Sequence, residues 1–300
     1  MAAASPTFRQ LGPGRVDPRP WLLLSPCLAT LGLFFVVPLA WLVRLSLYER
    51  ATGPGGFYLA DTLTVEHYGR VLTDPYFNRL AFATARLGLI VTVAAMALAY
   101  PLAAYLWRAG PGLKGATLLA VLLPKFTNLL VAMYGLLVLL ANAGPINLVL
   151  LASGLIREPL PMFANLFAVV VGETLIIAPY PILIIATALH GVDSQLVDAA
   201  RGMGAGPLRA FFEVPFKLTL PSVLLAALVS LIWALGAFTA PVVLGNPELY
   251  PAAVEVYTQT FEDVNWPLGA TLAVVNSLFV LVLVLAAYLL QRRIERGLGR

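Results

Sequence analysis

Charged residues are scarce in this chain of 300 residues. They make up 11% of it, whereas roughly 25% is typical of soluble domains. Apolar residues make up 60%, and the mean hydropathy is +0.87. A helix needs roughly 20 mainly apolar residues to cross the ~30 Å hydrocarbon core of a bilayer. Runs of this kind predict an all-α membrane protein with six transmembrane helices, at Trp21–Leu47, Leu80–Trp107, Ala116–Leu140, Phe163–Leu189, Ser222–Leu244 and Leu268–Leu290.

Cysteine and histidine are almost absent. The single cysteine, Cys27, excludes a disulfide framework and a thiol-rich metal site. It lies inside the first apolar run, where a small apolar packing role is the natural interpretation. His67 and His190 are isolated from each other and from other metal-ligating residues, so we interpret them as ordinary polar positions. The sequence therefore predicts no metal site.

Common catalytic motifs are also missing. The stretch GPGLKGAT, which starts at Gly110, has neither the spacing nor the hydroxyl position of a phosphate-binding loop. Neither a Gly-x-Ser-x-Gly turn nor a His-Glu-x-x-His zinc motif occurs. We therefore expect no catalytic residues and no ATP hydrolysis by this chain.

The N-terminal apolar run is too long for a cleaved secretory signal, whose apolar core is about 7–15 residues. It continues to Trp41 and ends at Arg44, which predicts an uncleaved anchor. Residues 1–20 are predicted to be a mobile cytoplasmic tail, 21–290 the six-helix domain, and 291–300 a cytoplasmic C-terminal tail.

Basic residues concentrate in alternate loops, which sets the orientation because cytoplasmic loops carry the excess of Lys and Arg. The predicted cytoplasmic set is Arg9, Arg15, Arg19, Arg108, Lys114, Arg201, Arg209, Lys217, Arg292, Arg293, Arg296 and Arg300. The opposite loops hold Arg50, Arg70, Arg79 and Arg157 and most of the acids, including Glu248, Glu255, Glu262 and Asp263. Both termini are therefore predicted to be cytoplasmic.

One cytoplasmic loop, residues 196–221, is unusually polar: LVDAARGMGAGPLRAFFEVPFKLTLP. The pattern predicts a short helix over Leu196–Gly204 and a second helix from Gly206–Pro207. Asp198 is expected near the positive start of the first helix, and Gly204 is expected to turn at positive φ. An amphipathic connector lying on lipid headgroups is the alternative interpretation.

This loop resembles the EAA loop of permease subunits of bacterial ATP-binding cassette (ABC) importers. That pattern has Glu-Ala-Ala, three residues, Gly, nine residues, then Ile-x-Leu-Pro. Asp198-Ala199-Ala200 takes the first place and Gly204 keeps the spacing. Lys217 stands where the pattern has proline, and Leu218-Thr219-Leu220-Pro221 supplies a second match downstream.

The likeness extends from about residue 20 to the C-terminus. The segments LTVEHYGRVLTDPYFNRL, YPLAAYLW, LLPKFTNLLVAMYGLLVLLANAGPINLVL and FTAPVVLG resemble the spermidine/putrescine-type branch. The resemblance implies a type I ABC importer (MetI-like) permease fold in the bacterial inner membrane. It also implies that the first helix of the loop contacts a cytoplasmic ATPase dimer through Asp198, Ala199, Ala200, Arg201 and Gly204.

The same resemblance implies further partners: a second related permease subunit, identical or different, and a periplasmic substrate-binding protein. ATP would be used by the ATPase subunits, and this chain would hold no cofactor. The lipid bilayer is its surroundings, and nothing in the sequence indicates a nucleic-acid partner.

Two charges are placed near the middle of predicted helices, about ten residues from an end at ~1.5 Å per residue. These are Lys125 and Glu173, with Asn128 nearby. A charge at the bilayer centre is costly and is expected to face the bundle interior. The residues either form a structural ion pair or line the substrate path.

The cargo is predicted to be a small polar solute of the polyamine type. The alternatives are an organic anion, an amino-acid derivative or a phosphonate, which Lys125 would attract. An ion-coupled secondary transporter is the alternative from another class, although no repeated halves are visible in the sequence.

Overall fold

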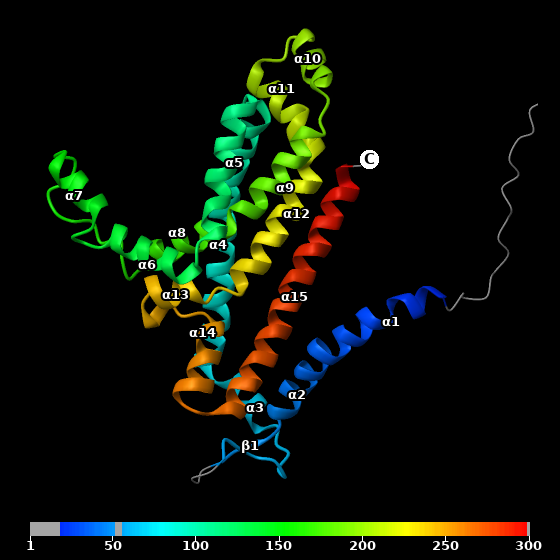
Figure 1. The fold of residues 1–300 in the computed structure, drawn as a ribbon, viewed down its shortest axis with the longest axis vertical. Helices are drawn as coiled ribbons and strands as arrows, with labels where there is room; N and C mark the ends of the chain where they lie inside the picture. Colours follow the sequence, from blue (N-terminus) through cyan, green and yellow to red (C-terminus); the bar gives the residue numbers. More distant parts are fainter. Residues whose placement is uncertain (1–18, 52–55, 299–300) are drawn as a thin grey trace, which may run out of the picture.

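The computed structural model describes residues 19–51 and 56–298, which form helices and a short antiparallel hairpin (Figure 1). The elements are α1 Arg19–Leu31, the π-helix η1 Gly32–Val36, α2 Val37–Leu45, β1 Glu49–Arg50, β2 Tyr58–Leu59, α3 Glu66–Thr73, α4 Pro75–Arg108, α5 Pro111–Phe126, α6 Leu129–Leu140, α7 Pro145–Ala152, α8 Leu166–Ile177, α9 Pro179–His190, α10 Ser194–Gly202, α11 Pro207–Glu213, α12 Pro215–Leu235, α13 Thr239–Leu244, the 3-10 helix η2 Pro247–Leu249, α14 Ala252–Tyr257, the π-helix η3 Thr258–Glu262 and α15 Trp266–Leu298. Residues 1–18 of the predicted N-terminal tail lie outside the described residues, and its last two residues, Arg19 and Pro20, begin α1.

Three helices, α4, α9 and α12, pack against one another and form the centre of the bundle. Along α4, Ala95, Ala99 and Ala103 repeat every fourth residue and are fully buried. This spacing places them on one face of the helix. Small side chains on that face allow neighbouring backbones to approach closely, which is how helices associate in lipid without a hydrophobic driving force between them.

Glycine marks two close approaches between helices. A Cβ at Gly88 of α4 would lie 2.7 Å from Leu235 Cδ2 of α12, and one at Gly172 of α8 would lie 2.5 Å from Leu244 Cδ1 of α13. Larger residues at either position would overpack the bundle.

Five helical segments are long and apolar enough to cross a membrane: Leu24–Leu45, Pro75–Arg108, Leu129–Ala152, Pro215–Leu235 and Trp266–Ile294. The pair α8 and α9, bent by 48°, passes the same test only if it is counted as one span. The structure is therefore all-helical in its membrane part, with five or six candidate spans among the described residues.

The predicted third helix, Ala116–Leu140, is wrong as a continuous helix. It breaks at Thr127–Asn128, and the candidate span starts at Leu129. Pro124 lies in the last turn of α5, and the Asn128 side chain accepts hydrogen bonds from the backbone N–H groups of Leu130 and Val131. An asparagine in this role satisfies the free donors at the start of a helix.

Other boundaries shift for similar local reasons. The predicted fourth helix bends at Ala178, directly before Pro179. The fifth starts seven residues earlier than predicted, at Pro215, and Gly236 separates α12 from α13. The last helix continues through the predicted C-terminal tail as far as Leu298.

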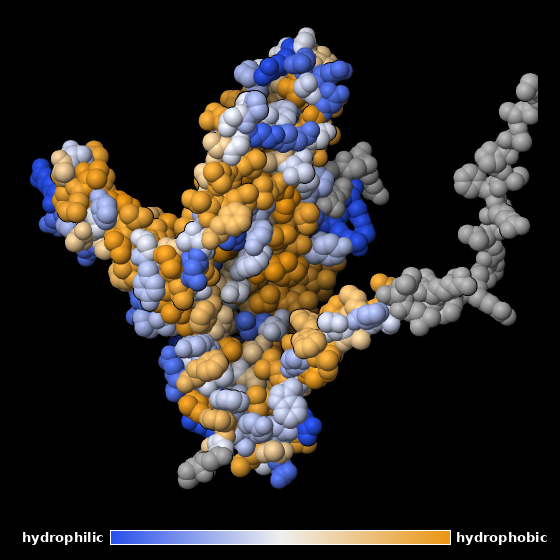
Figure 2. Space-filling view, in the orientation of Figure 1, coloured by the Kyte–Doolittle hydropathy of each residue, from blue (hydrophilic) through white to orange (hydrophobic). Residues whose placement is uncertain are grey.

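Two apolar segments extend away from the bundle on opposite sides: the N-terminal arm, α1–η1–α2, and the side arm, α6–α7 (Figure 1). The N-terminal arm carries strongly exposed side chains, among them Phe34 and Phe35. Hydrophobic side chains also cover much of the bundle surface between its two ends (Figure 2). Such surface is stable only against lipid or another apolar protein surface.

Candidate functional site

Two short helices, α10 and α11, form a polar hairpin that projects from one end of the bundle (Figure 1). The Asp193 side chain accepts a hydrogen bond from the Gln195 backbone N–H at 2.9 Å and caps the start of α10. Asp198, expected near that start, instead lies in the middle of the helix, so the sequence interpretation was wrong about which acid occupies the positive end. The predicted pair of helices is confirmed.

Gly204 ends α10 in a left-handed conformation, with φ +89°, as its place in the pattern predicted. Its N–H donates to the Arg201 carbonyl at 2.9 Å, and the N–H of Ala205 donates to the Ala200 carbonyl at 3.1 Å. These two bonds form a Schellman motif, in which a residue without a Cβ is strongly preferred at the left-handed position. The backbone at Gly204 therefore fixes the angle between the two helices of the hairpin.

An apolar seam closes the hairpin from inside. Val197 and Ala200 of α10 pack against Ala210 of α11, and Trp107 of α4 lies against the same cluster. Ala200 is only 8% exposed, so its methyl group holds the two helices together and is not available for direct contact with a partner.

The other predicted contact residues, Asp198, Ala199, Arg201 and Gly204, are exposed. Beside them lie apolar side chains that the sequence interpretation missed: Met203 is 84% exposed and Leu208 is 74% exposed, and Leu196 and Phe212 are also exposed. Apolar residues within a polar loop were the available signal. The hairpin presents a mixed apolar and charged surface of the kind found at protein interfaces.

Aromatic contacts join the hairpin to the bundle. The Arg108 guanidinium lies 5.4 Å from the centre of the Phe211 ring. Tyr100 contacts Phe211 and Phe216 edge to face, at 5.9 Å and 5.5 Å between ring centres. Edge-to-face rings and a cation over a ring are both attractive geometries. Movement of α11 would therefore be passed to α4 and α12 through packed side chains.

Within the bundle, Lys125 and Glu173 lie close enough for the charge of Lys125 to act on the Glu173 carboxyl group. They make no ion pair within 4.0 Å in the described part of the chain. Glu173 is 4% exposed, and its carboxylate has the backbone of Ala240, near the start of α13, as a hydrogen-bond partner. Asn128, the third predicted path residue, is exposed and caps α6.

Lys125 contacts two aromatic rings that the sequence interpretation did not connect with it. Its ammonium nitrogen lies over Tyr180 at 4.1 Å and over Trp233 at 5.4 Å from the ring centres. The two rings stack at 5.1 Å with an angle of 16° between their planes. The contacts come from α5, α9 and α12, which are far apart in sequence, so no local pattern could have found them.

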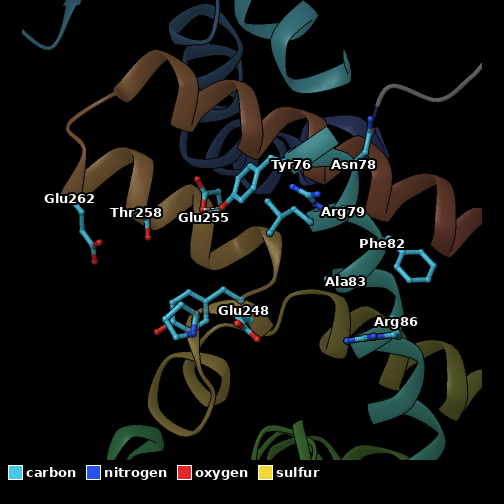
Figure 3. A pocket seen from close by; sticks show the side chains of 13 residues that line it. Tyr76, Asn78, Arg79, Phe82, Ala83, Arg86, Glu248, Glu255, Thr258 and Glu262 are labelled. Atoms are coloured by element: carbon cyan, nitrogen blue, oxygen red, sulfur yellow. Dashed lines mark hydrogen bonds between the residues drawn. The ribbon is translucent and has the colours of Figure 1, made fainter. Parts of the chain in front are cut away.

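At the opposite end from the hairpin, a cavity of ≈ 960 Å³ opens between α4 and the segment that contains η2, α14 and η3 (Figure 3). Its lining includes Glu248, Glu255 and Glu262 and, from α4, Arg79 and Arg86. The hydroxyl of Tyr76 donates to Glu255 Oε2 at 2.7 Å. Charges of both signs line this cavity.

Comparison with known proteins identifies the architecture. Residues 136–300 match the family described as "binding-protein-dependent transport system inner membrane component". The chain belongs to this family. It is an inner-membrane, multi-pass permease subunit of an ABC importer, which confirms the family resemblance seen in the sequence.

Among its relatives is the spermidine/putrescine transport system permease protein PotB of Haemophilus influenzae, 28% identical over 87% of this chain and 92% of that protein. PotB of Escherichia coli is 28% identical over 79% of this chain and 88% of that protein. A probable molybdenum ABC transporter permease protein of Haloferax volcanii is 30% identical over 91% of this chain and 93% of that protein.

Solved structures share the fold at low identity. A bacterial alginate ABC transporter, in complex with an alginate pentasaccharide-bound periplasmic protein, superposes with a TM-score of 0.75 at 17% identity over 92% of this permease and 96% of that chain. The MetNI methionine ABC transporter in an inward-facing conformation gives a TM-score of 0.57 at 19% identity, over 76% of this chain and 100% of that chain. The family fold therefore extends over nearly the whole described permease.

Proposed function

We propose that this permease imports polyamines, as part of a complex with a cytoplasmic ATPase dimer, a second permease subunit and a periplasmic substrate-binding protein. Both termini are cytoplasmic, and six spans result when the bent pair α8–α9 counts as one. This chain hydrolyses no ATP and holds no cofactor. It supplies one wall of the pathway and the surface that the ATPase moves.

The polar hairpin supports the proposed ATPase contact. Its basic residues, including Arg201 and Arg209, lie at the end of the bundle to which the positive-inside rule assigns the cytoplasm. Its exposed face combines Met203 and Leu208 with Asp198 and Arg201, which gives a partner both apolar area and charges to recognise.

The extended arms support a second permease subunit. The N-terminal arm contacts the rest of the chain mainly through α2 and α15, and its described apolar side chains, from Leu24 onward, are mostly exposed. By itself, the part of the chain that the structure describes encloses no pathway. A second subunit placed between an arm and the bundle would complete one.

The polyamine assignment depends on two independent observations. The PotB relatives, named for spermidine and putrescine transport, match most of the chain. The bundle itself holds groups that recognise ammonium ions: the aromatic pair Tyr180–Trp233 and the buried carboxylate of Glu173. Aromatic faces bind cations through the negative potential of the ring. The stacked aromatic pair Tyr180–Trp233 is the observation that carries this proposal.

The test is transport by the assembled complex in proteoliposomes. The permease is co-expressed with its ATPase, second permease and binding protein, and uptake of radiolabelled spermidine and of molybdate is measured with and without internal ATP. We expect ATP-dependent spermidine uptake that persists when proton and sodium gradients are collapsed. Uptake of molybdate without spermidine would refute the polyamine assignment, and gradient-driven uptake without ATP would refute the coupling.

A further inference from the structure

The ammonium group of Lys125 occupies a place that suits an alkylammonium ligand. It lies over the face of Tyr180 at 4.1 Å and also faces Trp233 at 5.4 Å. The two ring planes are nearly parallel, at 16°, with centres 5.1 Å apart, so one ammonium group lies within cation–π distance of both rings. In the described part of the chain, no carboxylate lies within 4.0 Å of this ammonium group. The lysine is therefore held by ring faces and not by an ion pair.

The chemistry of the lysine side chain matches the proposed cargo. Lysine carries its ammonium on a flexible four-carbon stem, which is the aminobutyl unit that putrescine and spermidine also contain. A surface that binds the end of this side chain would bind the end of a polyamine by the same contacts. Two ammonium groups cannot occupy one aromatic face together because like charges repel at this distance.

The surroundings give Lys125 room to leave. It is the penultimate residue of α5, and the chain breaks at Thr127–Asn128 directly after it. A cavity of ≈ 180 Å³ adjoins the ammonium group and is lined by Lys125, Thr127, Leu129 and Trp233, among others. Trp233 itself is 48% exposed, so the aromatic surface can be reached from outside the bundle core.

From this geometry we propose that Tyr180 and Trp233 form an alkylammonium subsite of the transport pathway, and that Lys125 occupies it as a tethered competitor which an incoming polyamine displaces. The proposal rests on polyamine import as the proposed function. It assigns Lys125 a role in cargo release: the lysine returns to the rings and lowers the affinity of the pathway for the cargo. The polyamine is then released from the rings instead of staying bound in the pathway.

The test is direct spermidine binding to the purified complete complex in nanodiscs, without the binding protein, by equilibrium dialysis. Lys125→Met removes the tethered ammonium and keeps an unbranched, flexible side chain that is one atom shorter. We expect it to tighten spermidine binding about tenfold, a change of the size expected for a partly desolvated cation–π contact. Lys114→Met in the same helix is the matched control, because Lys114 contacts His190 and not the aromatic pair.

A second background separates the subsite from a general charge effect. In the Tyr180→Leu/Trp233→Leu variant, we expect Lys125→Met to change spermidine affinity less than about twofold, because the surface for which the two cations compete is gone. A gain that survives without the rings, an equal gain from Lys114→Met, or no gain at all would overturn the proposal. Uptake by the wild-type complex separates the proposed function from the subsite. If the wild-type complex imports no spermidine, the proposed function fails. If it imports spermidine and Lys125→Met does not raise spermidine affinity, only the subsite is refuted. Variants are compared only where gel filtration shows an intact complex.

Discussion

The polar hairpin and the polar group around Lys125 inside the bundle are two charged regions that are built differently. The hairpin is local: residues 193–213 supply its cap, its turn and its apolar seam. The group around Lys125 collects side chains from α5, α8, α9 and α12. The hairpin should therefore be sensitive to backbone conformation at one glycine, and the bundle group to the chemistry of individual side chains.

The largest expected effect comes from exchanging the two bundle charges. Glu173→Lys places a cation at a buried position whose partner is the backbone of Ala240, and an uncompensated buried charge costs about 3–5 kcal/mol. Adding Lys125→Glu should not restore function, since the carboxylate would then face the rings of Tyr180 and Trp233. Spermidine uptake by the double variant is expected to be no higher than that of Glu173→Lys alone.

The control for this exchange is Glu173→Gln, which keeps a hydrogen-bond acceptor for the backbone of Ala240 and should retain the folded complex. Restoration of uptake to near the wild-type value in the exchanged double variant would mean that the two residues form a structural ion pair. The bundle group would then depend on charge pairing and not on the chemistry of each side chain.

The next effect is at the turn of the hairpin. Gly204→Val puts a β-branched residue at φ +89°, and a left-handed conformation costs such a residue at least about 1–2 kcal/mol. A cost of this size shifts the hairpin away from its docking conformation roughly tenfold. We expect ATP-driven uptake to fall accordingly, while membrane insertion, followed by protease accessibility, is unchanged.

A matched glycine lies two residues earlier. A Cβ at Gly202 would meet equally open space, but the backbone there has no positive φ, so Gly202→Val should transport nearly normally. Similar losses in both variants would show that side-chain bulk, and not backbone conformation, limits the contact with the ATPase.

A smaller effect is expected from a change at Met203, an exposed apolar residue of the hairpin that is not part of the EAA pattern. Met203→Asp places a charge on a residue that is 84% exposed and leaves the seam of the hairpin intact. If Met203 is buried by the ATPase, affinity should fall several-fold, as for an ordinary interface contact worth about 1 kcal/mol. Co-purification of the ATPase with the variant measures this. Leu63→Asp is the control, because Leu63 is exposed between β2 and α3, at the end of the bundle opposite α10 and α11 (Figure 1).

How far the sequence predicted these regions depended on where their contacts come from. Gly204 and the two helices of the hairpin followed from spacing and from glycine chemistry, because the hydrogen bonds involved join residues within five positions of each other. The wrong acid at the start of α10 came from a helix start placed two residues too late, and Ala200 was assigned outward because its partner, Ala210, lies on the next helix.

The bundle group shows what spacing cannot give. Position along the helices predicted that Lys125 and Glu173 lie at similar depth. It could not predict which neighbours each side chain meets, because that depends on packing and on the break in the helix at Thr127–Asn128. The polar cap at Asn128 was a visible local signal for that break. The rings of Tyr180 and Trp233 carried none, because aromatic residues are common throughout apolar helices.

The smallest expected effect is at the Glu213–Lys217 ion pair, on the surface at the start of α12. Lys217, through its hydrogen bond and its charge, lowers the pKa of Glu213 below the ordinary value of 4.5. Because the pKa is lowered in the folded state, the stabilisation by the pair is complete above the ordinary pKa of 4.5. It is lost as the pH falls through the lowered pKa. At about pH 6 to 8 the whole contribution of the pair is present, but exposed ion pairs contribute little, so Glu213→Gln should leave the thermal melting temperature close to that of the wild type over this range. A clear drop in melting temperature at neutral pH would indicate that this pair holds the hairpin to α12, and that the hairpin depends on more than its turn.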